Sequence, residues 1–218
     1  MILGLLCALG AGGLSLYNYL DSLRAGKASA DIMEQLADVI GDNLDESNAK
    51  DGGTSRKSRT ADGKLLTKMM ADPTKTPYRD MPTEMIDGYA YIGFLEIPSL
   101  SLSLPVMADW DYERLKISPC RYEGSYYTDD LVICGHNYAG HFSPVKWIEM
   151  GVDVYFTNVE GESIHYVTSN IQTVQPTSVA DMIGNNNNGE SQNDWDMTLF
   201  TCNTGGQTRC AVRCSRVR

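Results

Sequence analysis

The sequence predicts a mainly β fold: a closed β-barrel with short helices and an N-terminal helical extension. From about residue 85 onward, short runs rich in β-branched and aromatic residues alternate with turn residues. Few helical segments separate these runs, and this pattern favours a closed barrel over an α/β sheet. The 218 residues, 42% of them hydrophobic, suffice for one domain with its own core plus appendages. We therefore expect a membrane anchor at 1–20, a helical segment and flexible linker at 21–84, and the barrel at 85–218.

Residues 2–20 are almost continuously apolar and carry no charge. About twenty such residues can cross a bilayer as a helix, and Tyr17 and Tyr19 suit its interface. We therefore expect a transmembrane signal-anchor. Two alternatives stay open: a signal peptide cleaved near Ala28-Ser29-Ala30, and a buried helix of a soluble protein.

Between the anchor and the barrel, the sequence predicts one short helix and a linker. Ile32, Leu36, Val39 and Ile40 share a helical face, which predicts a helix at 31–40. Residues 41–59 are polar and rich in glycine and charge, and they predict a mobile linker. A helical turn is expected at 64–70, before three prolines that break any longer helix.

In the barrel, apolar alternation and turn residues define the expected strands. They are 89–97, ended by Pro98, then 102–106, 131–134, 153–157, 163–174, 197–201 and 209–216. Glu160 and Gly161 predict a hairpin turn between two of them. A helical turn is expected at 109–116, short helices at 142–150 and 178–183, and a surface loop at 185–189.

Charge and cysteine usage exclude two classes of protein. The formal net charge of -10 argues against a nucleic-acid binder, which needs a basic face to neutralise phosphate. The six cysteines are too sparse and uneven for a disulfide-stapled miniature. No Cys/His spacing completes a zinc site, so we expect neither a metal nor a cofactor.

Cys202 is the first candidate for chemistry. It ends an apolar strand just before a glycine-rich turn, where a thiol is accessible and its thiolate can act as a nucleophile. The alternative is an inert core cysteine. His136 stands between Gly135 and Asn137 at the end of another strand, and its imidazole is the natural partner of a thiol. We expect His141 and His165 to be structural.

Arg209 is the third candidate. It opens the last predicted strand, and a fixed guanidinium there can stabilise the oxyanion of a tetrahedral intermediate. Arg213 lies on the same face, about 13 Å further along the strand, and competes for this role. Both arginines could instead be a solvated cationic strand edge.

The chain resembles the sortases, the cysteine transpeptidases of Gram-positive cell surfaces. The likeness spans roughly residues 89–216 in a fixed order of short motifs. The matching segments are Tyr91-Ile92-Gly93-Phe94-Leu95-Glu96-Ile97-Pro98, Pro105-Val106, Gly135-His136-Asn137, Thr198-Leu199-Phe200-Thr201-Cys202, and Arg209 at the start of an apolar strand.

The resemblance implies an eight-stranded sortase barrel with His136, Cys202 and Arg209 as catalytic residues. It also implies that Thr201, which precedes the cysteine, helps to build the oxyanion site. The helical N-terminal extension looks more like class B than class A. The implied reaction is cleavage of a C-terminal sorting signal of a secreted protein through a thioacyl-enzyme. The acyl group is then transferred to an amine of peptidoglycan or of a pilin.

This function requires a barrel outside the cell membrane, held by a single N-terminal span. Arg24 and Lys27 follow the apolar run and no basic residue precedes it, which by the positive-inside rule would place the barrel in the cytoplasm. We expect instead that a basic segment lies upstream of the sequence.

Two other functions stay open. Another secreted cysteine peptidase is one, although papain-like enzymes place the cysteine before the histidine and this chain has the reverse order. An L,D-transpeptidase would have a histidine where this chain has Phe200. The other is a non-catalytic, membrane-anchored β-domain that binds cell-wall material, which has no need of a Cys, His and Arg set.

Overall fold

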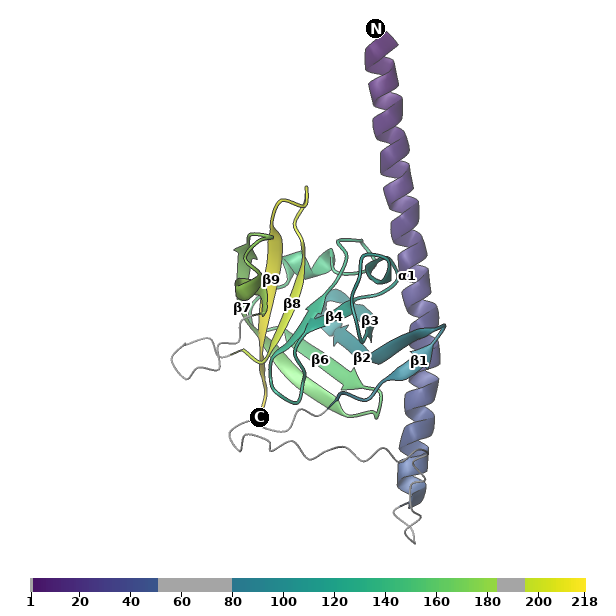
Figure 1. Ribbon diagram of the computed structural model, residues 1–218, viewed down its shortest axis with the longest axis vertical. Helices are drawn as coiled ribbons and strands as arrows, with labels where there is room; N and C mark the ends of the chain where they lie inside the picture. Colours follow the sequence, from purple (N-terminus) through teal and green to yellow (C-terminus); the bar gives the residue numbers. More distant parts are fainter. Residues whose placement is uncertain (1, 51–79, 184–194) are drawn as a thin grey trace, which may run out of the picture.

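The computed structural model describes residues 2–50, 80–183 and 195–218. It consists of one long helix, α1 (Ile2–Lys50), lying beside a β-barrel (Figure 1). The barrel strands are β1 (Glu84–Ile86), β2 (Tyr89–Ile97), β3 (Leu102–Met107), β4 (Cys120–Glu123), β5 (Leu131–Cys134), β6 (Asp153–Asn158), β7 (Ser163–Val174), β8 (Met197–Cys202) and β9 (Arg209–Arg216). A short helix, α2 (Val179–Ile183), follows β7, and three 3₁₀ turns, η1 (Pro98–Leu100), η2 (Arg114–Lys116) and η3 (Pro144–Trp147), lie in connections.

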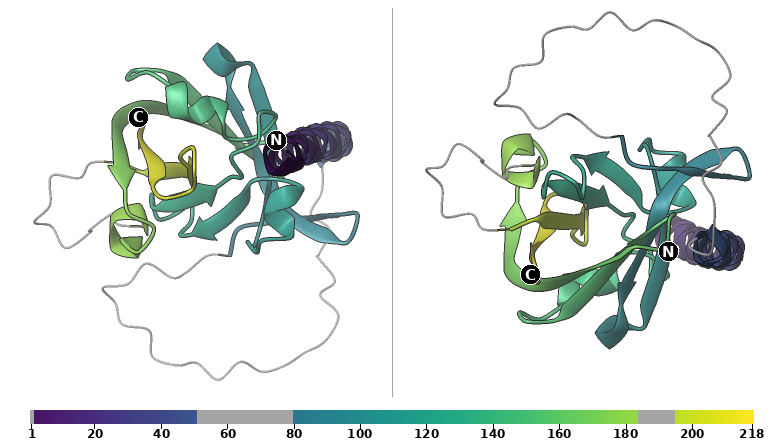
Figure 2. Two further views of the ribbon diagram at one scale, coloured as in Figure 1. Left: turned by 90° about the horizontal axis from the view of Figure 1, so that it is seen from above. Right: turned by 90° about the horizontal axis from the view of Figure 1, so that it is seen from below.

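The strands form one sheet in the order β1-β2-β3-β4-β5-β8-β9-β7-β6, and β6 pairs back onto β2. Eight of the described strands, β2 to β9, thus close the barrel, and β1 is an extra strand on β2. This confirms the predicted fold class. The pairs β3–β4 and β5–β8 are parallel, whereas the other pairs are antiparallel. Figure 2 shows α1 outside the barrel wall.

Gly93 makes the closure of the barrel possible. It pairs with Val106 of β3 and with Asn158 of β6, next to a register shift in β2. Its φ of 147° lies outside the range that side chains favour, and a Cβ there would stand 2.0 Å from the carbonyl oxygen of Thr157. Only glycine allows β2 and β6 to approach this closely.

Side-chain alternation divides the apolar residues into two clusters. Inward-facing residues such as Ile133, Leu199 and Val212 fill the barrel. Their strand neighbours Phe200 and Ala211 face outward and belong to a second cluster. α1 contributes Ile32, Leu36 and Ile40 to that cluster, so part of the outer barrel surface is also buried. Burying each such side chain contributes about 1.5–3 kcal/mol. Counting on from Phe200 along β8, Cys202 lies on the outer face.

α1 packs on the barrel along one stripe. Ala25, Ser29, Ile32, Leu36 and Ile40 are buried, at the three- and four-residue spacing of one helix face. The helix contains the predicted segment 31–40 but extends to Lys50, so the linker predicted from residue 41 is wrong as far as residue 50. A helix anchored by such a stripe elongates through polar residues because each added residue gains a hydrogen bond.

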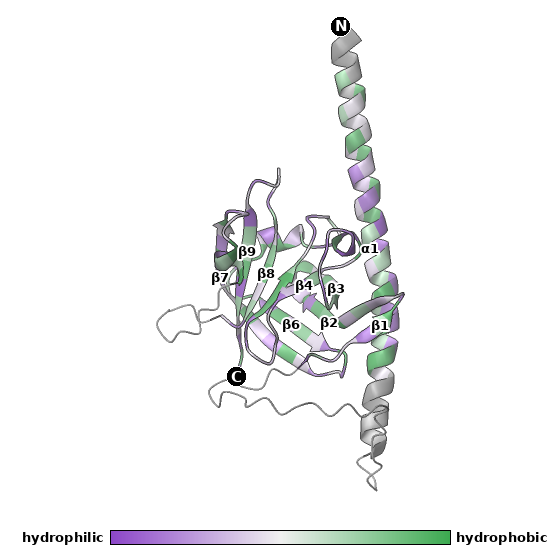
Figure 3. Cartoon of the chain, viewed as in Figure 1, coloured by the Kyte–Doolittle hydropathy of each residue, from purple (hydrophilic) through white to green (hydrophobic). Residues whose placement is uncertain are grey.

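The N-terminal part of α1 extends beyond the barrel (Figure 1), and its described side chains Leu9, Leu14, Leu16 and Tyr17 are exposed. Along the described part of α1 as a whole, apolar and polar residues are interspersed (Figure 3). Among the described residues, no helix has both the length and the hydropathy that crossing a membrane requires. α1 passes residue 20 without a break, so no helix end coincides with the predicted domain boundary.

Some local predictions differ from the structure. The helix predicted at 142–150 is only the 3₁₀ turn η3, held by i to i+3 hydrogen bonds such as Ile148 N–H to Val145 O. Pro144 stands in the first turn, where its missing amide hydrogen costs no bond, but Ile148 is already extended, so the turn ends there and no longer helix forms. β1 and β4 were not predicted. The segments expected at 51–59, 64–70 and 185–189 lie outside the described residues.

Candidate active site

β8 and β9 place Cys202 directly opposite Arg209. The two residues are the last register pair of the antiparallel ladder, where opposite Cβ atoms stand about 5 Å apart. The turn between them is tight, with Asn203 N–H bonded to Thr208 O at 2.9 Å and positive φ at Gly205 and Gly206. The sequence thus delivers the thiol and the guanidinium to the same rim of the barrel.

His136 reaches this rim through the parallel pair β5–β8. Cys134 pairs with Phe200, and the next amide, Gly135 N–H, donates to Phe200 O at 3.1 Å. A Cβ on Gly135 would stand 2.3 Å from the ring of Phe142, so a glycine is required just before the histidine. Parallel strands end at the same edge of a sheet, and His136 therefore follows β5 where Cys202 ends β8.

Thr201 is buried, and its hydroxyl donates to Gly135 O at 2.9 Å. This bond fixes the end of β8 to the end of β5, beside the histidine. Because the hydroxyl proton is engaged there, it is not directed at a bound substrate. The role of Thr201 in an oxyanion site stays a prediction.

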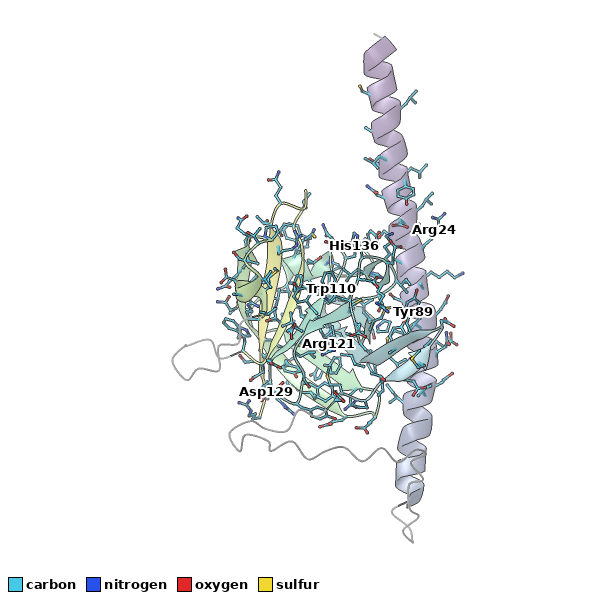
Figure 4. All side chains as sticks on the ribbon, viewed as in Figure 1. Arg24, Tyr89, Trp110, Arg121, Asp129 and His136 are labelled. Carbon is cyan, nitrogen blue, oxygen red and sulfur yellow. The ribbon has the colours of Figure 1, made fainter. Side chains whose placement is uncertain are left out.

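His136, Cys202 and Arg209 line one cleft of about 210 Å³. Figure 4 shows His136 on the side of the barrel that faces α1, at the level of Arg24. The cleft is mainly apolar, and its other lining residues are Trp110, Tyr112, Leu115, Tyr122, Cys134, Gly135, Pro176, Met182, Phe200 and Thr201. The structure thus brings together the three residues that the sequence predicted at separate strand ends.

His136 is half-buried, and this burial lowers its pKa below the ordinary value of 6.5. Asp21 raises this pKa and Lys116 lowers it further. The Nδ1 atom is buried and has no hydrogen-bond partner within the described residues. Instead, the ring stacks on Tyr138, with 3.8 Å between ring centroids and 15° between planes. A neutral imidazole therefore predominates at neutral pH, poised to accept a proton.

The two candidate arginines have different surroundings. Arg209 is partly exposed in the cleft, and its Nη1 donates to Gly206 O at 2.9 Å and to Thr208 O at 3.2 Å. Arg213 is fully buried, donates to the carbonyl oxygens of Asp181 and Met182 and to Thr198 Oγ1, and lies over the ring of Trp195. Burial lowers the pKa of Arg213 to about 10, so it stays charged and holds α2 on the barrel. Only Arg209 of the two lines the cleft.

The remaining histidines and cysteines lie elsewhere. His141 is buried between α1 and the barrel, with Nε2 3.0 Å from Ser29 Oγ. His165 pairs with Asp153 at 2.8 Å on β7 and β6. Cys7 is exposed, and four cysteines are buried: Cys120, Cys134, Cys210 and Cys214. No cluster of three or more metal-ligating side chains occurs in the part of the chain that the structure describes.

An aromatic wall of the cleft was not predicted. Trp110 and Tyr122 contact each other at 5.0 Å between ring centroids, and Tyr122 meets Phe200 edge-on at 5.1 Å. Tyr112 packs against Trp110 and is largely exposed. The sequence signal for this wall was the pair Trp110 and Tyr112, two large aromatic residues in the polar segment that follows β3. Such residues on a surface often mark a binding site.

The family model described as the sortase domain matches residues 95–217, more than half of the chain. The chain belongs to the sortase family. Comparison with curated protein sequences gives no match.

Solved sortase structures share the fold. Sortase C1 from Streptococcus agalactiae is 26% identical with a TM-score of 0.51, over 62% of this chain and 71% of that chain. Sortase D5 transpeptidase from Clostridium perfringens is 17% identical with a TM-score of 0.51, over 62% of this chain and 83% of that chain. A lid mutant of sortase A from Corynebacterium diphtheriae is 24% identical with a TM-score of 0.50, over 58% of this chain and 70% of that chain. The latter two show the fold alone, and the class B-like character stays a prediction.

Proposed function

We propose that this chain is a cysteine transpeptidase that cleaves a C-terminal sorting signal of secreted proteins and transfers the acyl group to an amine. The observation that carries the proposal is the convergence of Cys202, His136 and Arg209 on one cleft. A nucleophile, a base and a cation around one space are the parts that acyl transfer requires. Membership of the sortase family supports the same reaction class.

In the proposed mechanism, His136 accepts the thiol proton of Cys202, and the thiolate sulfur attacks the carbonyl carbon of the scissile peptide bond. Arg209, opposite Cys202 in the ladder, stabilises the negative charge on the carbonyl oxygen. The C–N bond breaks, and the imidazolium of His136 gives its proton to the leaving amine. An incoming amine then attacks the thioester and loses a proton to His136, and the Cys202 thiol is regenerated.

The cleft suits an extended peptide with apolar side chains. Trp110, Tyr122 and Phe200 form one wall, and Pro176 and Met182 also line the space. This is the apolar lining with few polar groups that ligand sites usually have. We propose the amine of a peptidoglycan precursor or of a pilin as the acceptor.

The test is mass spectrometry of the full chain incubated with a library of sorting-signal peptides, with and without an added amine. We expect an acyl adduct on Cys202, and a peptide–amine product when the amine is present. The Cys202→Ala variant should give neither, whereas Cys7→Ala, which removes an exposed thiol outside the cleft, should behave like the wild type. Hydrolysis without transfer would indicate a peptidase, and the absence of any adduct would indicate a binding domain.

We also propose that the barrel acts outside the cell membrane and is anchored through residues 1–20. The charge-free apolar sequence of 2–20 and the exposed Leu9, Leu14 and Leu16 support this placement. Protease added to intact cells should degrade the barrel. Protection of the barrel until the cells are lysed would contradict the proposal.

A further inference from the structure

α1 contacts four consecutive residues of the loop that carries the histidine, here named the His136 loop (residues 135–142). Its polar contacts are Tyr138 Oη to Asp21 Oδ2 at 2.5 Å, Ala139 N–H to Ser22 Oγ at 3.1 Å, and His141 Nε2 to Ser29 Oγ at 3.0 Å. Between these polar contacts, the backbones of Gly140 and Gly26 pack closely together. A Cβ on Gly140 would stand only 3.1 Å from Gly26 Cα. Thus α1 fixes the loop by direct contact.

The contacts on α1 come from one helix face. Asp21, Ser22, Gly26 and Ser29 follow the spacing that places residues above one another along a helix. Ser29 belongs to the buried stripe that packs α1 on the barrel. α1 (Ile2–Lys50) lies wholly outside the segment 95–217 that matches the sortase domain, so this contact joins the matched barrel to a part of the chain beyond the match.

Tyr138 connects α1 to His136. Its ring stacks on the imidazole at 3.8 Å between centroids, while its hydroxyl donates to Asp21. Burial, together with Asp21, raises the pKa of Tyr138 above its usual value, so the phenol keeps its proton and remains a donor. A single side chain therefore contacts the proposed base with its face and α1 with its tip.

His136 depends on this stack for its orientation. In catalytic triads, a third group holds the base by a hydrogen bond to the second ring nitrogen. Here the buried Nδ1 has no hydrogen-bond partner within the described residues. Phe142 N–H donates to His136 O at 3.1 Å and fixes the backbone, but not the ring. The ring of Tyr138, stacked on one face of the imidazole, is placed to restrict its rotation.

We propose that Tyr138 is a positioning residue for His136 chiefly through its stacked ring, and that α1, through the bond from Asp21 to the Tyr138 hydroxyl, adds a smaller restraint on that ring. The role in catalysis rests on the proposed transpeptidase function, whereas the effect on the imidazole itself does not. The same stack shields one face of the ring from water, and the carboxylate of Asp21 acts on its charge. Charged and titratable groups around His136 are Asp21 from α1, Lys116 from η2, His141 from its own loop, and Cys202 and Arg209 across the cleft.

The first test is the pKa of His136, measured by NMR on histidine-labelled full chain, which has three histidines. Asp21→Asn keeps a hydrogen-bond acceptor but removes the charge, so the pKa of His136 should fall. Tyr138→Leu removes the stacked ring and exposes the imidazole, so this pKa should rise toward 6.5. Asp31→Asn, at an exposed position of the same helix, should leave it unchanged. Opposite shifts in the two variants are not expected from a general loss of stability.

The second test is the rate of peptide–amine formation. Tyr138→Leu should lower kcat by about 10- to 100-fold with a smaller change in KM, the scale of misplacing a catalytic group by about 1 Å. Tyr138→Phe keeps the ring and should restore most of the activity. Tyr138→Phe and Asp21→Leu each break the same hydrogen bond, so the double variant should be no slower than the slower single variant.

Two glycines provide a matched pair. A Cβ on Gly140 would stand 3.1 Å from Gly26 Cα, so α1 or the loop must yield by a few tenths of an ångström, and Gly140→Ala should lower kcat. A Cβ on Gly26 meets Gly140 at an ordinary 3.8 Å, so Gly26→Ala should be neutral. The proposal is overturned if Tyr138→Leu, folded with an unchanged melting temperature, keeps both the pKa of His136 and the wild-type kcat. If the wild type forms no product, the proposed function fails, and the pKa pattern still decides whether Tyr138 and Asp21 control His136.

Discussion

The buried His141 should make this chain sensitive to mild acid. His141 is 0% exposed, and its Nε2 lies 3.0 Å from Ser29 Oγ. The Ser29 hydroxyl donates its proton to Ile117 O at 2.9 Å, so it accepts from His141, whose Nε2 carries the proton. Burial disfavours the charged imidazole and lowers the pKa of His141 to about 4. The folded chain therefore holds His141 neutral at a contact between α1 and the His136 loop.

The size of the effect follows from the two pKa values. An unfolded histidine has a pKa of about 6.5, so between about 6.5 and about 4 the unfolded chain binds the proton and the folded chain does not. The stability that depends on neutral His141 is present above pH 6.5 and is lost as the pH falls toward 4. The gap corresponds to about 3 kcal/mol in total, of which about 2 kcal/mol is lost by pH 5.

Urea unfolding of wild type and His141→Gln at pH 7 and pH 5 measures this effect. Gln does not titrate, and its amide can still donate to Ser29. The free energy of unfolding of the wild type should fall by about 2 kcal/mol more than that of the variant between the two pH values. Other groups titrate equally in both proteins and cancel in the difference. An equal fall in both would refute the assignment of a neutral, desolvated His141.

Three further substitutions test the site and its support. Arg209→Ala should lower kcat/KM by about 100- to 1,000-fold, as the loss of an oxyanion donor does, with an unchanged free energy of unfolding. Arg213→Met should instead lower the free energy of unfolding by about 3 kcal/mol, because buried carbonyls of α2 lose their charged donor; the reverse ranking in peptide-cleavage and urea assays would show that the roles are exchanged. Gly135→Ala should displace Phe142, which a Cβ would meet at 2.3 Å, and lower activity and melting temperature together. A fully active Gly135→Ala would mean that the His136 loop tolerates movement.

The long strands were predictable because local pattern determines them. β2, β7 and β9 occur with the predicted ends, since their alternation is long enough to read. β5 has only four residues but also has the predicted ends, because all four are apolar and Gly135 follows. β1 and β4 have three and four residues, and β4 meets β3 at a single register pair. Strands this short without a continuous apolar run depend on tertiary pairing rather than on propensity. The extension of α1 beyond residue 40 likewise has no local apolar signal.

The site likewise contains residues that the local sequence predicts and residues that only tertiary contacts reveal. His136, Cys202 and Arg209 stand at strand ends, where sequence pattern and family resemblance both point. The support of His136 by Tyr138 and Asp21 joins residues 117 positions apart, and neither residue belongs to a motif. The contact becomes visible only when α1 is placed against the barrel. Residues that act through another residue leave no periodic signal in one sequence.

The strand topology explains why three distant residues meet at one rim. β5 and β8 are parallel neighbours, so the residues after their C-terminal ends emerge at the same edge. β9 returns antiparallel from β8, so its first residue, Arg209, lies where β8 ends with Cys202. The barrel therefore fixes the backbone of Cys202, the proposed nucleophile, and of Arg209, the proposed oxyanion donor, by ladder hydrogen bonds. His136 lies two residues beyond the end of β5, in a loop, and of the three it is the one whose side chain needs support from outside the barrel. The contact between α1, Tyr138 and His136 supplies that support at the point where the sheet itself cannot.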